Sequence, residues 1–333
     1  MNHDPGIWWW VGFNALVVGL LLLDLFVFHK EAHEVKPKEA ALWSVFWVVL
    51  SMLFNLFVYL EFGPQAGIEF LTGYLIEKSL SVDNLFVFVM IFSYFRVPAR
   101  YQHRVLFWGI IGALLLRAFL IGVGSYLIEQ FDWMIYVFGG FLVYTGVRMS
   151  LEKETAIEVE ANPLIKVLRK VLPITNRYHD QRFLVREAGR WVATPLLVVL
   201  VMVESTDVIF ALDSIPAIFA VTKEPFIVYT SNIFAILGLR ALYFLLANVI
   251  DKFHLLKYGL SIVLTYIGVK MIVTAFDIHI DTLFSLGIVA IVLTASVVLS
   301  LVFPRREDEE TLAPPVDNPQ VSDAPVLREE TEE

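Results

Sequence analysis

Acidic side chains interrupt otherwise apolar stretches of this 333-residue sequence. Seven of them fall where the chain is long and apolar enough to cross a membrane: Asp24, Glu61, Glu77, Asp83, Glu204, Asp207 and Asp213. One acid at the centre of a membrane helix costs about 2.5–3.5 kcal/mol on insertion scales, so a function is the default explanation for such residues. Grouped carboxylates inside a membrane bind cations or protons, and we expect that chemistry first.

Basic residues also lie in these stretches, and we take three of them as internal bases, namely Lys78, Arg117 and Arg240. The arginines could tie helices together through ion pairs, which would be a structural role. Seven acids against three bases nevertheless leave a surplus of about four negative charges, which protons or bound cations could neutralise. The sequence alone leaves both interpretations open.

The available donor atoms limit the kind of cation. The chain has no cysteine, and its seven histidines lie at the ends of the apolar stretches or between them. The interior therefore offers carboxylate, amide, hydroxyl and backbone oxygens, which suit Mg²⁺, Ca²⁺ and Mn²⁺ better than Zn²⁺, Cu⁺ or Ni²⁺. The lack of cysteine also excludes disulfides and a cysteine nucleophile.

The elements that must position these residues are membrane helices. Hydrophobic residues make up 58% of the chain and charged residues only 18%, which argues against a soluble enzyme, a disordered chain or a nucleic-acid binder. Because a span needs about 20 apolar residues, we predict an all-α polytopic membrane protein with nine transmembrane helices. They cover residues 7–28, 42–60, 67–95, 105–128, 133–150, 192–219, 226–250, 258–276 and 283–303.

Lysine and arginine concentrate in alternate loops, which predicts an outside N-terminus and a cytoplasmic C-terminus in the plasma (inner) membrane. The long loop contains PLIKVLRKVL at 163–172, which we interpret as a basic amphipathic helix at the inner surface or as a plain linker helix. From Arg305 onward the chain has ten acidic and three basic residues. This segment supplies −7 of the net charge of −9, and we predict that it is a disordered tail.

A three-helix unit occurs twice. LLLRAF at 114–119 is echoed by LGLRAL at 237–242, and YTGVRM at 144–149 by YIGVKM at 266–271. Earlier in each copy, EKSLSVDN at 77–84 corresponds to DVIFALDS at 207–214. Because each copy holds an odd number of spans, the two copies insert in opposite directions. This construction is typical of secondary transporters, whose substrate site lies between the repeats.

These features divide the chain into six parts. They are two first helices (1–66), repeat 1 (67–151), a cytoplasmic loop (152–191), repeat 2 (192–276), a last helix (277–304) and the acidic tail (305–333).

Helix geometry limits how the acids can converge. On an ideal helix Asp83 lies about 120° around the axis from Glu77, so one straight helix cannot direct both to one ion. Pro216 cannot donate to the carbonyl of Leu212, which predicts a break in the second acidic helix and frees a further oxygen ligand. A simple kink is the alternative.

The acidic motifs EKSLSVDN at 77–84 and VESTDVIFALDSIPA at 203–217 make the chain resemble the TerC family of integral membrane proteins, over residues 8–303. The family is named for tellurite (tellurium) resistance, and some members look like manganese exporters. The resemblance implies export of Mn²⁺ and a metal site made of Glu77, Asp83, Asn84, Glu204, Asp207, Asp213 and Ser214. Candidates for proton transfer or ion pairing are Asp24, Glu61, Lys78, Arg117 and Arg240.

We therefore expect a secondary transporter that exports Mn²⁺ or a similar hard divalent cation, with protons as the candidate counter-ion. Its partners would be the divalent ion and the lipid bilayer, without nucleic acid, cofactor or enzymatic activity. The sequence has no P-loop motif, which argues against ATP hydrolysis.

Two other functions stay open. One is a membrane scaffold in the response to tellurite, pH or redox stress, docking through the loop or the tail, as a homo-oligomer or with other membrane partners. The other is an intramembrane aspartyl protease, whose two acids would share a proton. Asp83 and Asp213 stand beside Asn84 and Ser214 in a larger set of carboxylates, which fits ion ligation better.

Overall fold

The computed structural model of the protein describes residues 6–28, 37–151, 162–175, 177–187, 189–247, 250–274, 276 and 280–303. The predicted tail (305–333) and the side chain of Asp24 lie outside the described residues. The described chain is almost entirely helical, which confirms an all-α polytopic membrane protein.

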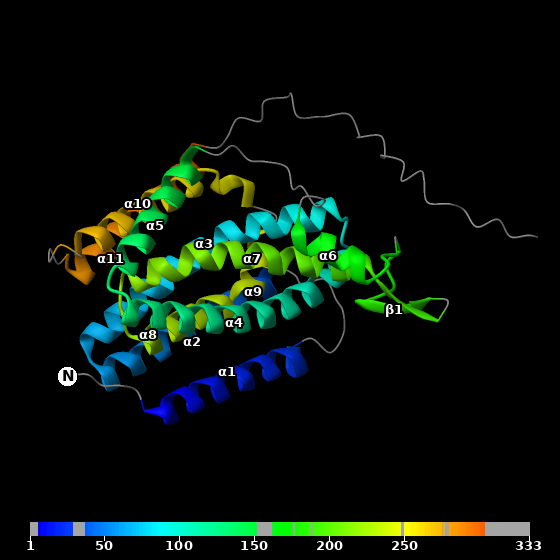
Figure 1. Cartoon of the computed structure of the whole chain (residues 1–333), viewed down its shortest axis with the longest axis horizontal. Coiled ribbons are helices and arrows are strands. Elements are labelled where there is room, and N and C mark those ends of the chain that lie inside the picture. Colours follow the sequence, from blue (N-terminus) through cyan, green and yellow to red (C-terminus); the bar gives the residue numbers. More distant parts are fainter. Residues whose placement is uncertain are drawn as a thin grey trace, which may run out of the picture.

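The helices follow one another along the chain, and the long loop between α5 and α7 contains α6 and two short strands (Figure 1). They are α1 (Ile7–Phe28), α2 (Pro37–Phe62), α3 (Pro64–Tyr94), α4 (Ala99–Gln130), α5 (Met134–Leu151), α6 (Pro163–Val171), α7 (Pro195–Phe219), α8 (Pro225–Leu237), α9 (Leu239–Leu246), α10 (Leu256–Thr274) and α11 (Thr282–Val302). A short 3₁₀ helix, η2 (Ile250–Phe253), precedes α10.

Seven spans in the described part of the chain are long and apolar enough to cross a membrane: α2, α4, α5, α7, the α8–α9 segment, α10 and α11. The apolar stretch Ile7–Leu23 of α1 is shorter. The 31-residue α3 is long enough but carries Glu77, Lys78 and Asp83 in its middle. Nine membrane-spanning helices therefore stay a prediction, although each of the nine predicted stretches overlaps at least one helix.

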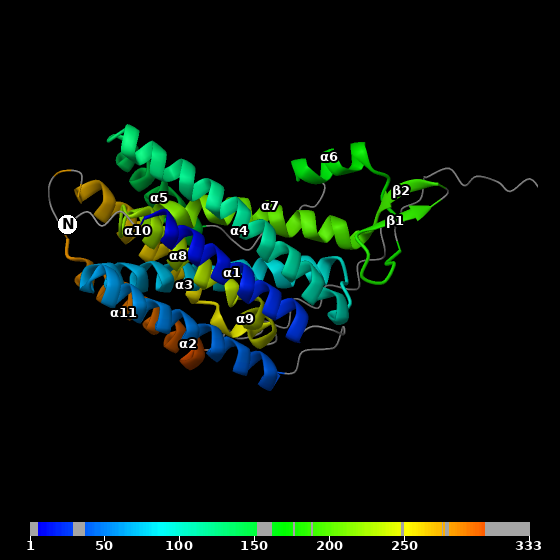
Figure 2. The ribbon, with the colours of Figure 1, turned by 90° about the horizontal axis from the view of Figure 1, so that it is seen from below.

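Four helices form the centre of the bundle. Helix α3 packs against α8 and α7, and α4 packs against α7 and α8, so each half of the chain contributes two central helices. Helix α5 pairs with α10 beside them, and Figures 1 and 2 show α1 along the outside of the bundle. Each of these contacts joins a helix of one predicted repeat to a helix of the other. The internal duplication itself stays a prediction.

The α5–α10 pair is held at backbone contact distance by small residues. A Cβ atom on Gly268 would lie 2.7 Å from the carbonyl oxygen of Gly139, and one on Gly146 would lie 2.9 Å from that of Ser261. The Ser261 hydroxyl donates to the Gly146 carbonyl at 2.6 Å. Membrane helices associate closely where small residues let the backbones approach.

Two features of the predicted loop emerge at one end of the bundle (Figure 2). The predicted short helix is α6, whose first N–H groups are capped by the Asn162 side chain and whose Ile165 is buried. A hairpin of β1 (Leu184–Glu187) and β2 (Arg190–Ala193) follows, with a turn in which Gly189 has a φ of 80°. We did not predict this hairpin. It moves the start of the sixth span from 192 to Pro195.

The break predicted at Pro216 is wrong. Helix α7 runs through Pro216 and ends at Phe219, so the proline lies in the last turn, where one missing hydrogen bond does not interrupt the helix. The interruption lies instead in the seventh span, where Gly238 separates α8 from α9. Near it, the Lys78 ammonium donates to the carbonyl of Ala235 at 3.2 Å.

Candidate functional site

A buried arginine joins the two halves of the bundle. On α4, Arg117 is 1% exposed, and its Nη1 forms an ion pair with Oε1 of Glu77 on α3. Its Nη2 lies 3.1 Å from Oδ1 of Asp207 on α7, and its Nε donates to Oδ2 of the same carboxylate at 3.4 Å. Both carboxylates are buried as well. One guanidinium therefore binds an acid from each predicted repeat.

Two neutral side chains complete this cluster. Arg117 Nη1 also donates to Ser214 Oγ at 3.1 Å and to Asn232 Oδ1 at 3.3 Å. The Asn232 amide donates to Oε2 of Glu77 at 3.1 Å, which brings α8 into the network. The central cluster, Glu77, Arg117, Asp207, Ser214 and Asn232, thus links all four central helices. Breaking a buried network of this kind leaves unpaired charges, so it fixes how the helices meet.

A third acid lies next to this cluster. A Cβ atom on Gly112 of α4 would lie 2.0 Å from Oε1 of Glu204, so the carboxylate of Glu204 occupies the space that a larger residue would fill. One residue further along α7, Ser205 accepts a hydrogen bond at 2.7 Å from the Asn162 amide, which caps α6. Helix α6 is thereby attached beside Glu204.

We expect Gly112→Ala to destabilise the protein, because the new methyl group forces the Glu204 carboxylate out of its position. The carboxylate ends a flexible side chain that is only partly buried, so it can swing aside, and we expect the lower end of the about 1–3 kcal/mol that overpacking costs. Gly122→Ala on the same helix is the matched control, since nothing lies within 4 Å of the position that its Cβ atom would take. Thermal unfolding in detergent micelles should separate the two variants; equal unfolding temperatures would contradict the contact.

The second pair of repeated acids lies in a different electrostatic environment. Asp83 on α3 interacts with Lys257 of α10, and Asp213 on α7 interacts with Arg148 of α5 and with Asp83. Both acids are only partly buried. The neighbouring Asn84 is buried in α3. The predicted site residues are therefore distributed between the central cluster and this second acidic pair.

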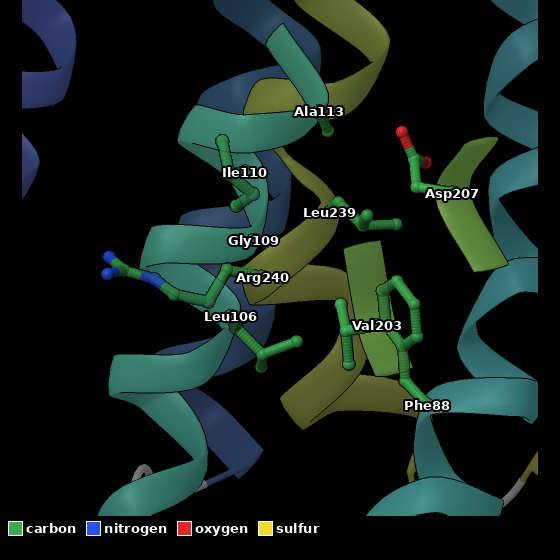
Figure 3. A pocket seen from close by; sticks show the side chains of 9 residues that line it. All are labelled: Phe88, Leu106, Gly109, Ile110, Ala113, Val203, Asp207, Leu239 and Arg240. Carbon is green, nitrogen blue, oxygen red and sulfur yellow. The ribbon is translucent and has the colours of Figure 1, made fainter. Parts of the chain in front are cut away.

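Arg240, which corresponds to Arg117 in the repeat, does not join the central cluster. It lines a small cavity with Asp207, Leu239 and residues of α3, α4 and α7, about as large as one water molecule needs. Figure 3 shows its guanidinium directed away from Asp207. The two arginines correspond in sequence, but only Arg117 takes part in the hydrogen bonds given above for the central cluster.

The structure brings Glu77, Asp207 and Ser214 together, with Glu204 beside them. In the part of the chain that the structure describes, no three acidic or histidine side chains meet as a metal-ligand group. Glu61 is exposed at the end of α2, away from this arrangement. From the sequence we considered that the arginines could tie helices together through ion pairs. Arg117 does so, because it pairs with Glu77 and Asp207.

From the sequence we did not identify three residues that interact with the buried or partly buried acids. Asn232 stands in an apolar run and has no counterpart in the acidic motifs, although a buried amide in a membrane helix is a signal in itself. Arg148 and Lys257 stand near helix ends, where basic residues usually mark topology. Their interactions with Asp213 and Asp83 depend on packing between helices, which the sequence does not specify.

The fold and the cluster define a polytopic α-helical membrane protein whose centre is built from paired charges. The family model described as "Integral membrane protein TerC family" matches residues 62–308. The chain belongs to the TerC family.

Several relatives match along nearly their whole length. A membrane protein of Myxococcus xanthus is 53% identical over 91% of this chain and 94% of its own. The Escherichia coli (strain K12) relative named "Putative membrane-bound redox modulator Alx" is 49% identical over 90% of this chain and 96% of its own. A membrane protein of Rickettsia bellii is 40% identical over 87% and 98%. No solved structure matches the chain.

Proposed function

We propose that this protein is a secondary transporter for a hard divalent cation, with Mn²⁺ as the favoured substrate. The choice of Mn²⁺ and the outward direction come from the family resemblance, with the C-terminus on the cytoplasmic side. Transport requires no chemical change of the substrate, so no enzymatic step and no cofactor belong to this proposal.

The observation that carries the proposal is the charge balance of the central cluster. Two buried carboxylates, those of Glu77 and Asp207, face one guanidinium. In their ionised forms the three groups sum to −1, which is costly inside a membrane unless a proton or a cation joins them. The surrounding oxygens belong to carboxylate, amide and hydroxyl groups, and such donors suit hard cations.

Arg117 and a transported cation would compete for the same carboxylates. Each acid is bonded to Arg117, so a divalent ion can gain these oxygens only if the guanidinium releases at least one of them. Ion binding then changes contacts between α4 and its neighbours α3 and α7. A ligand shifts a conformational equilibrium through such differential contacts.

The test is ion flux in proteoliposomes that contain the purified full-length chain. We expect uptake of Mn²⁺ above that of protein-free vesicles, with Ca²⁺, Mg²⁺ and Zn²⁺ measured in parallel. Asp207→Asn should lower the Mn²⁺ flux at least about tenfold, because a charged ligand in a buried network is worth about 1.5–3 kcal/mol.

Glu129→Gln is the matched control, since it removes an exposed acid at the end of α4 and should leave the flux within about twofold of the parent. Wild-type vesicles that carry none of the four ions would overturn the proposal. If the Asp207→Asn variant is folded and transports Mn²⁺ normally, the central cluster does not belong to the transport pathway.

A membrane component in stress resistance is the second candidate, favoured by the name of the Escherichia coli relative. The chain itself has no cysteine, so a thiol–disulfide step of its own is excluded and any redox effect would be indirect. Deleting residues 305–333 and α6 discriminates between the two functions: a transporter keeps its ion flux, whereas a scaffold loses its phenotype.

A further inference from the structure

Three arginines surround a recess at the end of the bundle that carries α6 and the hairpin. The recess has a volume of about 490 Å³, and it lies between the first two turns of α4 and the segment before β1. Its lining consists of Arg100, Tyr101, Arg104, Asp180, Gln181 and Arg182. Three guanidinium groups against one carboxylate give this surface a net charge of +2.

Two of the three arginines, Arg100 and Arg104, are held in place by neighbouring groups. The Arg104 guanidinium lies 5.2 Å from the ring centroid of Phe183, and its Nη1 donates to Gln181 Oε1 at 3.5 Å. The Arg100 guanidinium lies 4.8 Å from the ring centroid of Tyr101. Stacked guanidinium groups keep their N–H donors available for a planar or tetrahedral anion.

The segment that forms the second wall of this open recess is anchored to the turn between α3 and α4. The Tyr178 hydroxyl donates to the carbonyl oxygen of Phe95 at 2.7 Å. Burial raises the pKa of Tyr178, so this hydroxyl stays protonated and keeps donating. The recess is therefore formed by two segments joined to each other rather than by a free loop.

The surroundings indicate that the recess lies at the level of lipid headgroups. Tyr94 at the end of α3 and Trp191 on β2 are both exposed, at 60% and 59%. Exposed tyrosine and tryptophan are typical of the membrane–water interface. On α6, Leu164 and Val167 are exposed beside Lys166 and Lys170, the pattern of a helix that lies in the interface.

We propose that this recess binds a phosphate group, and that the phospholipid headgroup of an anionic lipid supplies it. Arginine binds phosphate through two parallel N–H donors, and basic pockets at the cytoplasmic end of membrane helices bind anionic headgroups. The N-terminal end of α4, which forms one wall, adds a favourable helix dipole. The site is separate from the central cluster and does not depend on the proposed transport.

The test uses the purified full-length protein in detergent micelles, with binding followed by native mass spectrometry and by thermal stabilisation. Phosphatidylglycerol, phosphatidylcholine and inorganic phosphate are added separately. We expect phosphatidylglycerol to bind and stabilise more than phosphatidylcholine. Arg100→Gln with Arg182→Gln should weaken that binding about 30-fold, as the loss of two arginine contacts at a membrane surface predicts.

Arg186→Gln with Arg190→Gln is the control, because it removes the same charge from the hairpin, outside the recess. Stabilisation by inorganic phosphate that the recess variant alone loses would support the phosphate site and assign it to the free anion. Equal effects of the two double variants would overturn the proposal, because binding would then reflect overall positive charge. Equal binding of phosphatidylglycerol and phosphatidylcholine, with no effect of inorganic phosphate, would overturn the proposal as well.

Discussion

Replacing Arg117 by methionine should remove about 3–5 kcal/mol from the free energy of unfolding. The variant leaves the carboxylates of Glu77 and Asp207 buried without their shared cation, and an uncompensated buried charge carries a penalty of this size. Denaturant or thermal unfolding of the purified protein in detergent micelles measures the loss.

Two further variants make this expectation specific. Arg117→Met combined with Glu77→Gln and Asp207→Asn removes all three charges, and it should recover much of the stability, since a neutral cluster has no unpaired ion. Arg190→Met, on the exposed hairpin, should change the free energy of unfolding by less than about 0.5 kcal/mol. If Arg117→Met unfolds like the parent, the ion pairs do not hold the central helices together.

Gly268→Val should cost about 3 kcal/mol, because the new side chain meets backbone that cannot move aside. A Cβ atom at this position lies 2.7 Å from the Gly139 carbonyl oxygen and 2.8 Å from the Val143 nitrogen. Overpacking usually costs about 1–3 kcal/mol, and contact with the backbone of a partner helix belongs at the upper end. The expected consequence is separation of α5 from α10, measured as a lower unfolding temperature.

Gly140→Val supplies the control on α5. It lies next to Gly139 in sequence, yet nothing lies within 4 Å of its Cβ position. The valine there should leave the unfolding temperature close to that of the parent. Similar losses for Gly268→Val and Gly140→Val would mean that helix propensity rather than the α5–α10 contact sets the stability.

Much of the fold could be predicted because membrane helices follow from length and hydrophobicity alone. Helix α1 has the same limits as the first predicted stretch, and α6 follows from a capping asparagine, a proline at the first turn and a periodic apolar face. The β1–β2 hairpin escaped prediction because strands of four residues are too short for alternation to be recognised. Gly238 interrupts a span that reads as continuous in hydropathy.

The site was predicted in part. The repeat placed Glu77 and Asp207 at corresponding positions, and they do meet, through Arg117. The same correspondence suggested similar roles for Arg117 and Arg240, but which arginine reaches Glu77 and Asp207 depends on side-chain packing that sequence equivalence does not encode. The rule that proline interrupts a helix suggested a break at Pro216. Because Pro216 lies in the last turn of α7, its missing hydrogen bond does not interrupt the helix.

The pairing of α5 with α10 could also have been predicted from repeated small residues in the sequence. Gly146 and Gly268 occupy the same position in YTGVRM and YIGVKM. In the structure Gly146 contacts Ser261 and Gly268 contacts Gly139, and these partners also correspond at an offset of 122 residues. A repeated small residue on facing helices is a packing signal that could have predicted this pair.

The central cluster also sets an order of assembly during synthesis. Arg117 follows Glu77 by 40 residues, whereas Asp207 follows Arg117 by another 90, about 5–18 s later at usual elongation rates. Of the membrane charges named above, α3 and α4 bring Glu77, Asp83, Lys78 and Arg117, which sum to zero. Helices α3 and α4 can therefore enter the bilayer electrically balanced with respect to these residues, and Asp207 can reach Arg117 only when α7 emerges from the ribosome.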